Sequence, residues 1–259
     1  MPDALDPKSL SQKRFGQHAE EYVKSQSHAG GADLDRMLEL AQPQADWLVL
    51  DIATGGGHTA LKFARHVARV VASDLTTRML AAAERHIRAQ NVTNVEFKLA
   101  DAEDLPFTDG RFDLVTCRIA PHHFPHVDRF LQESARVLKV GGLLVVQDHV
   151  LPEDETAAAY VDGIEKLRDP SHHRAFSEKE WLALVEAAGL EILHTEHFIK
   201  RHGVHSWAQR QGVSAGVLAQ LEDQLIEAPP DAAEWLTVEN PRTPTASFAY
   251  HYLIIVARK

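Results

Sequence analysis

Short apolar runs alternate with helix-like segments through the middle of the chain, from about residue 47 to residue 150. The runs are apolar on both faces, which is typical of parallel strands that helices cover on each side. They lie at residues 47–51, 68–74, 95–99, 112–118 and 143–148. Strand and helix in repeated alternation predict right-handed crossovers and a doubly wound parallel sheet.

Two segments between these runs have a clear helical period. Residues 77–90 place Leu80, Ala83 and Ile87 on one face, and residues 127–138 repeat the same pattern. We expect the pair Gly141-Gly142 to end the second helix, because glycine is common just past a helix end.

The two ends of the chain follow other patterns. Residues 1–45 predict a helical lid, with a break at residues 28–31. Residues 46–150 are the predicted binding core, and residues 151–259 predict the rest of the sheet with cap helices. The latter region has helical patterns at 156–167, 177–188 and 206–228, and strand patterns at 191–198 and 247–257. The second of these helices opens on a capping box, Ser177 with Glu180, and Pro229-Pro230 is expected to end the third. The expected fold is α/β, with a seven-stranded, mostly parallel sheet.

Length, charge and cysteine content limit the classes of protein to which this chain can belong. The 259 residues suffice for one large α/β domain with additions. A formal net charge of −10 argues against a nucleic acid as partner. The single cysteine, Cys117, excludes an internal disulfide and favours a reducing, cytoplasmic location. The chain starts without a signal-peptide pattern and has no apolar run of about 18 residues, so we expect no membrane span.

The strongest candidate for a ligand site is a glycine-rich turn after the first apolar run. In VLDIATGGGHTALKFA (residues 49–64), the predicted strand ends at Asp51 and a helix begins near His58 or Thr59. Glycines at 55–57 let a ligand approach the backbone, and the helix start offers free N–H groups. Asp74 ends the second strand, where an acid can accept hydrogen bonds from two ribose hydroxyls.

Two nucleoside ligands compete for such a turn, a dinucleotide and S-adenosylmethionine. The dinucleotide fingerprint is G-x-G-x-x-G, and the register that starts at Ala53 lacks its first and last glycines. Asp51 would repel a pyrophosphate and suits the ammonium group of a methionine moiety. A tight turn without a ligand is the remaining alternative, although three consecutive glycines carry an entropic cost that packing alone rarely requires. The methyl donor is therefore the preferred ligand.

The segment after the third strand supports the same ligand. Asp101 and the Ala102 backbone are placed to address the edge of an adenine, and Leu75 and Met79 to sandwich its face. Leu75 and Met79 fit the apolar core of a helix equally well. The neighbouring acids at 103 and 104 are expected to be solvated loop charges.

Five stretches of the chain resemble those of class I S-adenosylmethionine-dependent methyltransferases: VLDIATGGG, VVASDLTTRML, LADAEDLPF, RFDLVTCRIAPHHFPH and RVLKVGGLLVVQD. Within that family they are similar to the ubiquinone/menaquinone-biosynthesis methyltransferases and related bacterial small-molecule methyltransferases. The chain departs from the family pattern in two places. Ala53 stands where the first glycine is usual, and Val140 where a proline is usual.

The resemblance implies S-adenosyl-L-methionine as the donor and S-adenosyl-L-homocysteine as the product. It implies that Arg118 lies near the methionine moiety, and that Phe15, Tyr22 and residues 25–29 fold over the donor. With the residues singled out above, the predicted donor contacts are Phe15, Tyr22, Asp51, Ala53, Gly55, Gly57, Asp74, Leu75, Met79, Asp101, Ala102 and Arg118.

Methyl transfer to a hydroxyl or an activated carbon needs a base, and histidine is the usual candidate near neutral pH. His149, after the fifth strand, is the first candidate and His123, after the fourth, is the second. For either residue, a role as a hydrogen-bonded structural or surface histidine is the more common one. The residues His122, His123, His126, Asp148 and His149 could also gather around a metal ion, but their spacing matches no known ligand motif, so no metal is expected.

The expected function is methyl transfer to a small, partly apolar molecule, with residues 206–240 as the cap that selects it. Trp207, Trp235 and Phe248 are candidates for the acceptor pocket, whereas Trp181 fits a helix core. The alternatives are a donor-binding protein without catalysis, an RNA or protein methyltransferase, and an NAD-linked oxidoreductase. The oligomeric state, for instance a homodimer, does not follow from the sequence.

Overall fold

The computed structural model describes residues 6–24 and 31–259, and for residues 17, 18, 20–22 and 24 it describes the backbone only. In these ranges eight strands form one sheet, whose main order is β3-β2-β1-β4-β5-β8-β7. The strands are β1 (Leu48–Ile52), β2 (Arg69–Asp74), β3 (Val95–Leu99), β4 (Phe112–Arg118), β5 (Leu138–Leu151), β6 (Phe176–Ser177), β7 (Glu191–Gly203) and β8 (Ser247–Arg258).

The α/β fold with a mostly parallel sheet is confirmed. Strands β1 to β5 pair in parallel, and β8 runs antiparallel between β5 and β7. The prediction of seven strands is one short, because the two-residue β6 also pairs with the end of β5, Phe176 opposite Val150. A strand of two residues has no alternating pattern, so the sequence carried no signal for it.

Strand β5 begins earlier than expected, and the glycine pair lies inside it. Helix α6 (Val127–Val137) already ends before Leu138, which has an extended backbone and pairs with Phe112. Gly141 has φ of 80°, and the register between β4 and β5 shifts over this stretch. The two glycines therefore form an irregularity in the strand and not the end of the helix.

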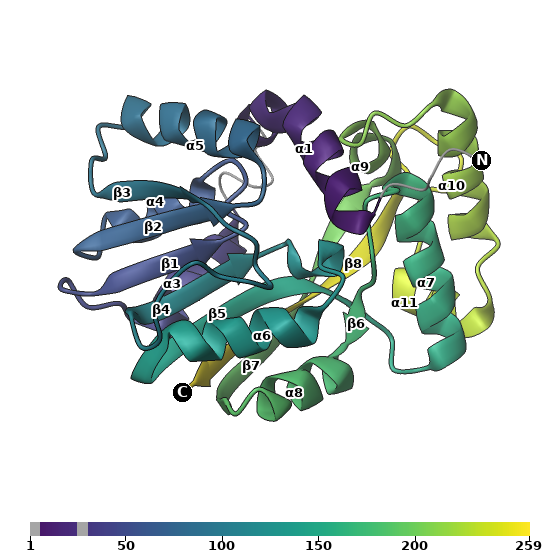
Figure 1. Ribbon diagram of the computed structural model, residues 1–259. Coiled ribbons are helices and arrows are strands. Elements are labelled where there is room, and N and C mark those ends of the chain that lie inside the picture. Colours follow the sequence, from purple (N-terminus) through teal and green to yellow (C-terminus); the bar gives the residue numbers. More distant parts are fainter. Residues whose placement is uncertain (1–5, 25–30) are drawn as a thin grey trace.

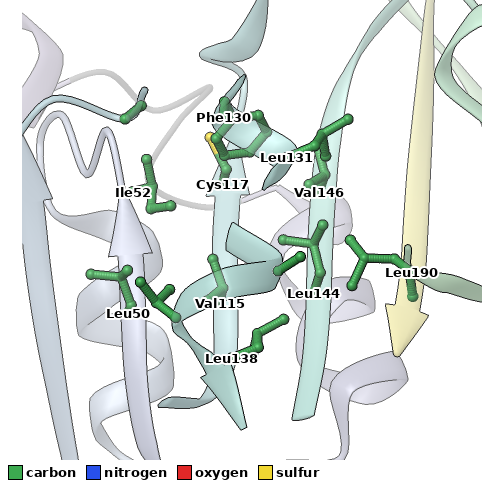
Figure 2. Close-up of a cluster of buried hydrophobic side chains, with 14 of the residues drawn as sticks. Leu50, Ile52, Val115, Cys117, Phe130, Leu131, Leu138, Leu144, Val146 and Leu190 are labelled. Atoms are coloured by element: carbon green, nitrogen blue, oxygen red, sulfur yellow. The ribbon is translucent and has the colours of Figure 1, made fainter. Parts of the chain in front are cut away.

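Helices cover both faces of the sheet (Figure 1). Helices α3 (Ala32–Ala41), α4 (His58–Ala64) and α5 (Thr77–Ala89) pack on one face, and α6 and α8 (Glu178–Ala187) pack on the other. Figure 2 shows the second layer, where Phe130 and Leu131 of α6 lie beside Cys117 of β4 and Val146 of β5. Fully burying a side chain of this size contributes about 1.5–3 kcal/mol. These two layers hold the carboxyl ends of the strands in place.

The C-terminal helices form a cap beside the sheet. Helices α7 (Glu155–Arg168), α9 (Val204–Gln209), α10 (Ala215–Ile226) and α11 (Pro230–Leu236) enclose an apolar cluster around Trp207 and Phe248. The single helix expected over 206–228 is wrong, since a turn separates α9 from α10. Pro230 starts α11 and does not end a helix, because proline fits the first helical turn. The capping box of α8 is present as predicted.

Helix α1 (Pro7–Lys24) passes over the carboxyl edge of the sheet, between α5 and the cap (Figure 1). Ala19 of α1 packs against Met79 and Ala82 of α5. In the two described ranges no helix combines the length and the apolar character needed to cross a membrane. The position of α1 makes it the roof of the space described next.

Candidate functional site: a pocket at the carboxyl ends of the strands

A pocket lies where β1, β2 and β4 end, below helix α1. In doubly wound sheets ligands bind at this edge. The pocket is lined by most of the residues predicted to contact the donor: Phe15, Asp51, Ala53, Gly55, Asp74, Leu75, Met79, Asp101, Ala102 and Arg118. The side chain of Tyr22 and the whole of residues 25–29 lie outside the described residues.

The glycine-rich turn forms the floor of this pocket. Ala53 and Gly55 both have left-handed backbone conformations, with φ of 52° and 53°. Gly57, with φ of 82°, does not line the pocket. A Cβ atom built on it would lie 2.9 Å from Ile87 Cδ1, so this glycine lets α4 pack closely on α5. The third glycine thus has a packing role, which differs from the predicted donor contact.

Ala53 offers a test of backbone strain in the turn. The left-handed conformation costs a non-glycine residue about 1–2 kcal/mol. Ala53→Gly should therefore stabilise the protein by about 0.5–1 kcal/mol, after the greater freedom of glycine in the unfolded chain is subtracted. Urea unfolding measures the difference. Ala81→Gly, at an exposed position of α5, is the control and should destabilise by about 1 kcal/mol. Equal losses in both variants would show that the turn is unstrained at Ala53.

Two buried carboxylates face the turn. Asp51 accepts hydrogen bonds from the hydroxyls of Thr54 at 2.6 Å and Thr116 at 2.8 Å. Asp74 accepts from the backbone N–H groups of Gly55 at 3.0 Å and Thr76 at 2.8 Å. Burial raises the pKa of each to about 6, so both are mostly ionised at pH 7 and above. A carboxylate has about four lone-pair sites, so both acids can accept further hydrogen bonds from a ligand.

The third acid, Asp101, is paired with the roof of the pocket. Lys8 Nζ of α1 lies 2.6 Å from Asp101 Oδ2 and 2.6 Å from Glu103 Oε2. Glu103 is buried and also accepts a hydrogen bond from the backbone N–H of His126 at 2.8 Å, so its prediction as a solvated charge is wrong. Lys8 was missed, because a lysine in the first turn of an amphipathic helix looks like any solvated charge.

Arg118, at the end of β4, is held by a buried ion pair. Its Nη2 and Nε atoms lie 2.6 Å and 3.0 Å from Asp33 Oδ2, and Nε also donates to Gln147 at 3.0 Å. Lys200 contacts the other oxygen of Asp33. Through Arg118 and Lys200, Asp33 links helix α3 to strands β4 and β7, and Arg118 links them to Gln147 of β5.

Ile119, which follows Arg118, has φ of 53° and lines the pocket. For a β-branched residue this conformation is an outlier that costs roughly 1–3 kcal/mol, and such strain concentrates at functional sites. No pattern in the sequence indicated it.

Comparison with known proteins gives the same family as the sequence motifs that line this pocket. Residues 50–146 match a family described as a methyltransferase domain. A protein of Bacillus subtilis (strain 168), named uncharacterized methyltransferase YcgJ, is 37% identical over 220 residues, which are 85% of this chain and 87% of that protein. The chain belongs to the class I S-adenosylmethionine-dependent methyltransferases.

Two further proteins support the assignment. The crystal structure of a putative methyltransferase from Bacillus halodurans C-125 is 38% identical with a TM-score of 0.85, and the match covers 88% of this chain and 99% of that one. A ubiquinone/menaquinone biosynthesis C-methyltransferase of Pseudomonas putida is 37% identical over 129 residues, which are 48% of this chain and 50% of that enzyme. The predicted resemblance to this group of methyltransferases is confirmed.

The structure separates the two histidines proposed as bases in this methyltransferase. His123 lines the pocket, and its ring lies 4.8 Å from that of Phe15 in an edge-on arrangement. Its Nδ1 lies 2.9 Å from the carbonyl oxygen of Ser171, which places a proton on Nδ1 and leaves the lone pair on Nε2. Burial lowers the pKa of His123, so its ring is neutral at pH 7.

His149 lies outside the pocket of the methyltransferase. It is buried, with its Nδ1 3.4 Å from Asp148 Oδ1 and its ring 4.4 Å from that of His122. It lines a second, smaller cavity together with Trp235 and Phe248. Its predicted role as the first-choice base therefore has no support from its position, whereas that of His123 does.

Proposed function

We propose that this methyltransferase binds S-adenosyl-L-methionine in the pocket below α1 and methylates a small, partly apolar molecule beside His123. The observation that carries the proposal is the meeting of Asp74 with the glycine-rich turn in one pocket. An acid at the end of β2 can hold two ribose hydroxyls, and the turn can receive the methionine end. Asp74 and the glycine-rich turn therefore fit S-adenosyl-L-methionine.

Each end of the donor has matching residues in the proposed arrangement. Asp101 and the backbone of Ala102 are assigned to the adenine edge, and Leu75 and Met79 to its faces. Asp51, buried and mostly ionised at pH 7 and above, is assigned to the ammonium group. Arg118 is assigned to the methionine carboxylate, because its guanidinium is held in place by Asp33.

When bound, S-adenosyl-L-methionine would supply a methyl group whose carbon is open to in-line attack by an electron pair of the acceptor, with S-adenosyl-L-homocysteine leaving with the electrons of the C–S bond. The protein's share is to place the acceptor, exclude water and accept a proton. Nε2 of His123 accepts that proton from a hydroxyl or carbon acid, and the Ser171 carbonyl stabilises the charged ring through Nδ1–H.

The acceptor class follows from the surroundings of His123. The pocket there is lined by Phe15, Ile119, Phe124 and Pro125, which suits a molecule with an apolar part. The net charge of −10 disfavours RNA as the acceptor. We assign helix α1 to a lid over the donor and the cap helices α7 and α9 to α11 to selection of the acceptor. The free, buried Cys117 fits action in a reducing cytoplasm.

The proposal is tested with Asp74→Ala. Loss of two hydrogen bonds to a charged acceptor should raise the dissociation constant for S-adenosyl-L-methionine by about 100-fold or more, as measured by calorimetry. Because burial raises the pKa of Asp74 to about 6, binding to the unmodified protein should weaken as the pH falls through 6. Asp104→Ala, an exposed acid in the next loop, is the matched control. Unchanged affinity in Asp74→Ala, or no binding to the unmodified chain, contradicts the proposal.

A further inference from the structure

A second cluster of ionisable side chains lies behind His123, outside the pocket assigned to the donor. It joins three elements: His149 comes from β5, Glu165 from α7 and His172 from the loop that follows α7. All three residues are at most 5% exposed. One potential ligand atom from each lies within 4.8 Å of those from the other two. Buried ionisable groups this close require an explanation, since burial without compensation is costly.

The two histidines each keep one ring nitrogen available. Among the described residues, Nε2 of His149 has no hydrogen-bond partner although it is buried, while its Nδ1 faces Asp148. In His172, Nε2 forms a hydrogen bond with Asp162 Oδ1 at 2.7 Å, so Nδ1 is the nitrogen available to a ligand. A histidine bound to a metal typically has its second ring nitrogen held by a carboxylate or a carbonyl. Asp162 provides this arrangement for His172, and Asp148 is the carboxylate that faces the second nitrogen of His149, at 3.4 Å.

Glu165 supplies the third ligand. Its Oε2 accepts a hydrogen bond from Arg168 Nη1 at 2.9 Å. Because a carboxylate has about four lone-pair sites, this contact orients the side chain and still leaves sites for a cation. The side chain is thus held for coordination by a residue of its own helix, α7.

A neighbouring trio, His122 with Asp148 and His149, also brings ligand atoms within 4.8 Å of one another. Its carboxylate is already occupied. Asp148 accepts from His122 Nδ1 at 2.7 Å, from the His122 backbone N–H at 2.9 Å and from the His149 backbone N–H at 2.9 Å. These contacts describe a closed hydrogen-bonded network, so we assign no metal to that trio.

We propose that His149, Glu165 and His172 bind one divalent transition-metal ion. Two imidazoles and one carboxylate are a ligand set that suits first-row ions from manganese to zinc and leaves coordination positions open. An apolar cavity with Val161, Ile164 and Leu236 borders both His149 and Glu165. A water molecule in this cavity would complete the coordination of the ion. His149 is then a ligand and not a base.

The experiment uses the full-length, tag-free chain after removal of metal with a chelator. Co²⁺ is titrated with visible absorption as the readout, and Zn²⁺ by calorimetry. We expect one site per chain, a d–d absorption band, and a rise of about 5 °C or more in Tm when Zn²⁺ exceeds its Kd 100-fold. His149→Ala, Glu165→Ala and His172→Ala should each weaken Zn²⁺ binding at least 100-fold. His205→Ala is the control, since this histidine also pairs with a glutamate, Glu222, but on α9 and α10.

Asp162→Asn gives a second test in which the shape of the side chain is kept. Loss of the acceptor that orients His172 should weaken Zn²⁺ binding about 10- to 100-fold. Far-UV circular dichroism and affinity for S-adenosyl-L-methionine report whether each variant is folded, and the second readout also keeps this test separate from that of the donor pocket. The proposal is overturned if the chain takes up no Co²⁺ or Zn²⁺, or if the folded Asp162→Asn and His172→Ala proteins bind Zn²⁺ as tightly as His205→Ala does.

Discussion

Replacing Asp33 by alanine is expected to lower the free energy of unfolding by about 3–5 kcal/mol, because the change leaves Arg118 buried without its counter-ion. The Arg118 side chain is only 4% exposed and that of Asp33 is fully buried. For a chain of this size the loss corresponds to a fall of roughly 10 °C in Tm. Urea unfolding followed by circular dichroism measures it.

The same helix provides the control. Asp35 of α3 pairs with Lys62 but is 63% exposed, so Asp35→Ala should cost about 1 kcal/mol or less. If Asp33→Ala were no more harmful than Asp35→Ala, the ion pair at Arg118 would not be a structural link between α3 and the sheet. Donor affinity should fall together with stability in Asp33→Ala, because Arg118 then loses the group that orients it towards the pocket.

His123→Ala is expected to lower kcat by about 1,000-fold, which lies within the range for loss of a general base. An acceptor for this assay comes from a panel of small molecules screened for release of S-adenosyl-L-homocysteine. Because burial lowers the pKa of His123, the ring is neutral at pH 7, and activity of the unmodified enzyme should decline only when the pH falls below that lowered pKa. This acid limb should disappear in the variant, while the dissociation constant of the donor stays within a factor of about three.

His126→Ala controls for the loss of an imidazole nearby, since His126 is exposed and does not line the pocket. His149→Ala, measured in parallel, compares the two histidines directly. Retention of more than a tenth of kcat in His123→Ala would assign the proton to another acceptor or to solvent.

The central fold could be predicted because its signals are local. Each apolar run that is covered on both faces became a strand, and β3 and β4 match the predicted limits. The C-terminal region was harder, since Pro229-Pro230 is compatible with both the end and the start of a helix, and tertiary packing on Trp207 and Phe248 decides between them. The limits of β5 depended on pairing with β4 and β8, which no local pattern contains.

The candidate site likewise contains residues that local sequence signals mark and residues that only distant contacts bring together. Asp51, Asp74 and the glycine-rich turn are marked by their place after apolar runs, and all of them meet in the pocket. Lys8 reaches Asp101 from 93 residues away. The trio His149, Glu165 and His172 has irregular spacing and becomes recognisable only when β5, α7 and the following loop meet. Contacts made by distant segments leave no period in the sequence.

Because Gly57 packs against Ile87, the positions of the glycine-rich turn differ in the room they leave for a side chain. A methyl group at residue 53 is already accommodated, and one at residue 55 would meet Met79 Cε at an ordinary 3.6 Å. At residue 57 the same methyl group would force two helices apart. A side chain at residue 57 therefore meets both a clash and a left-handed backbone, whereas a side chain at residue 55 meets only the cost of the left-handed backbone.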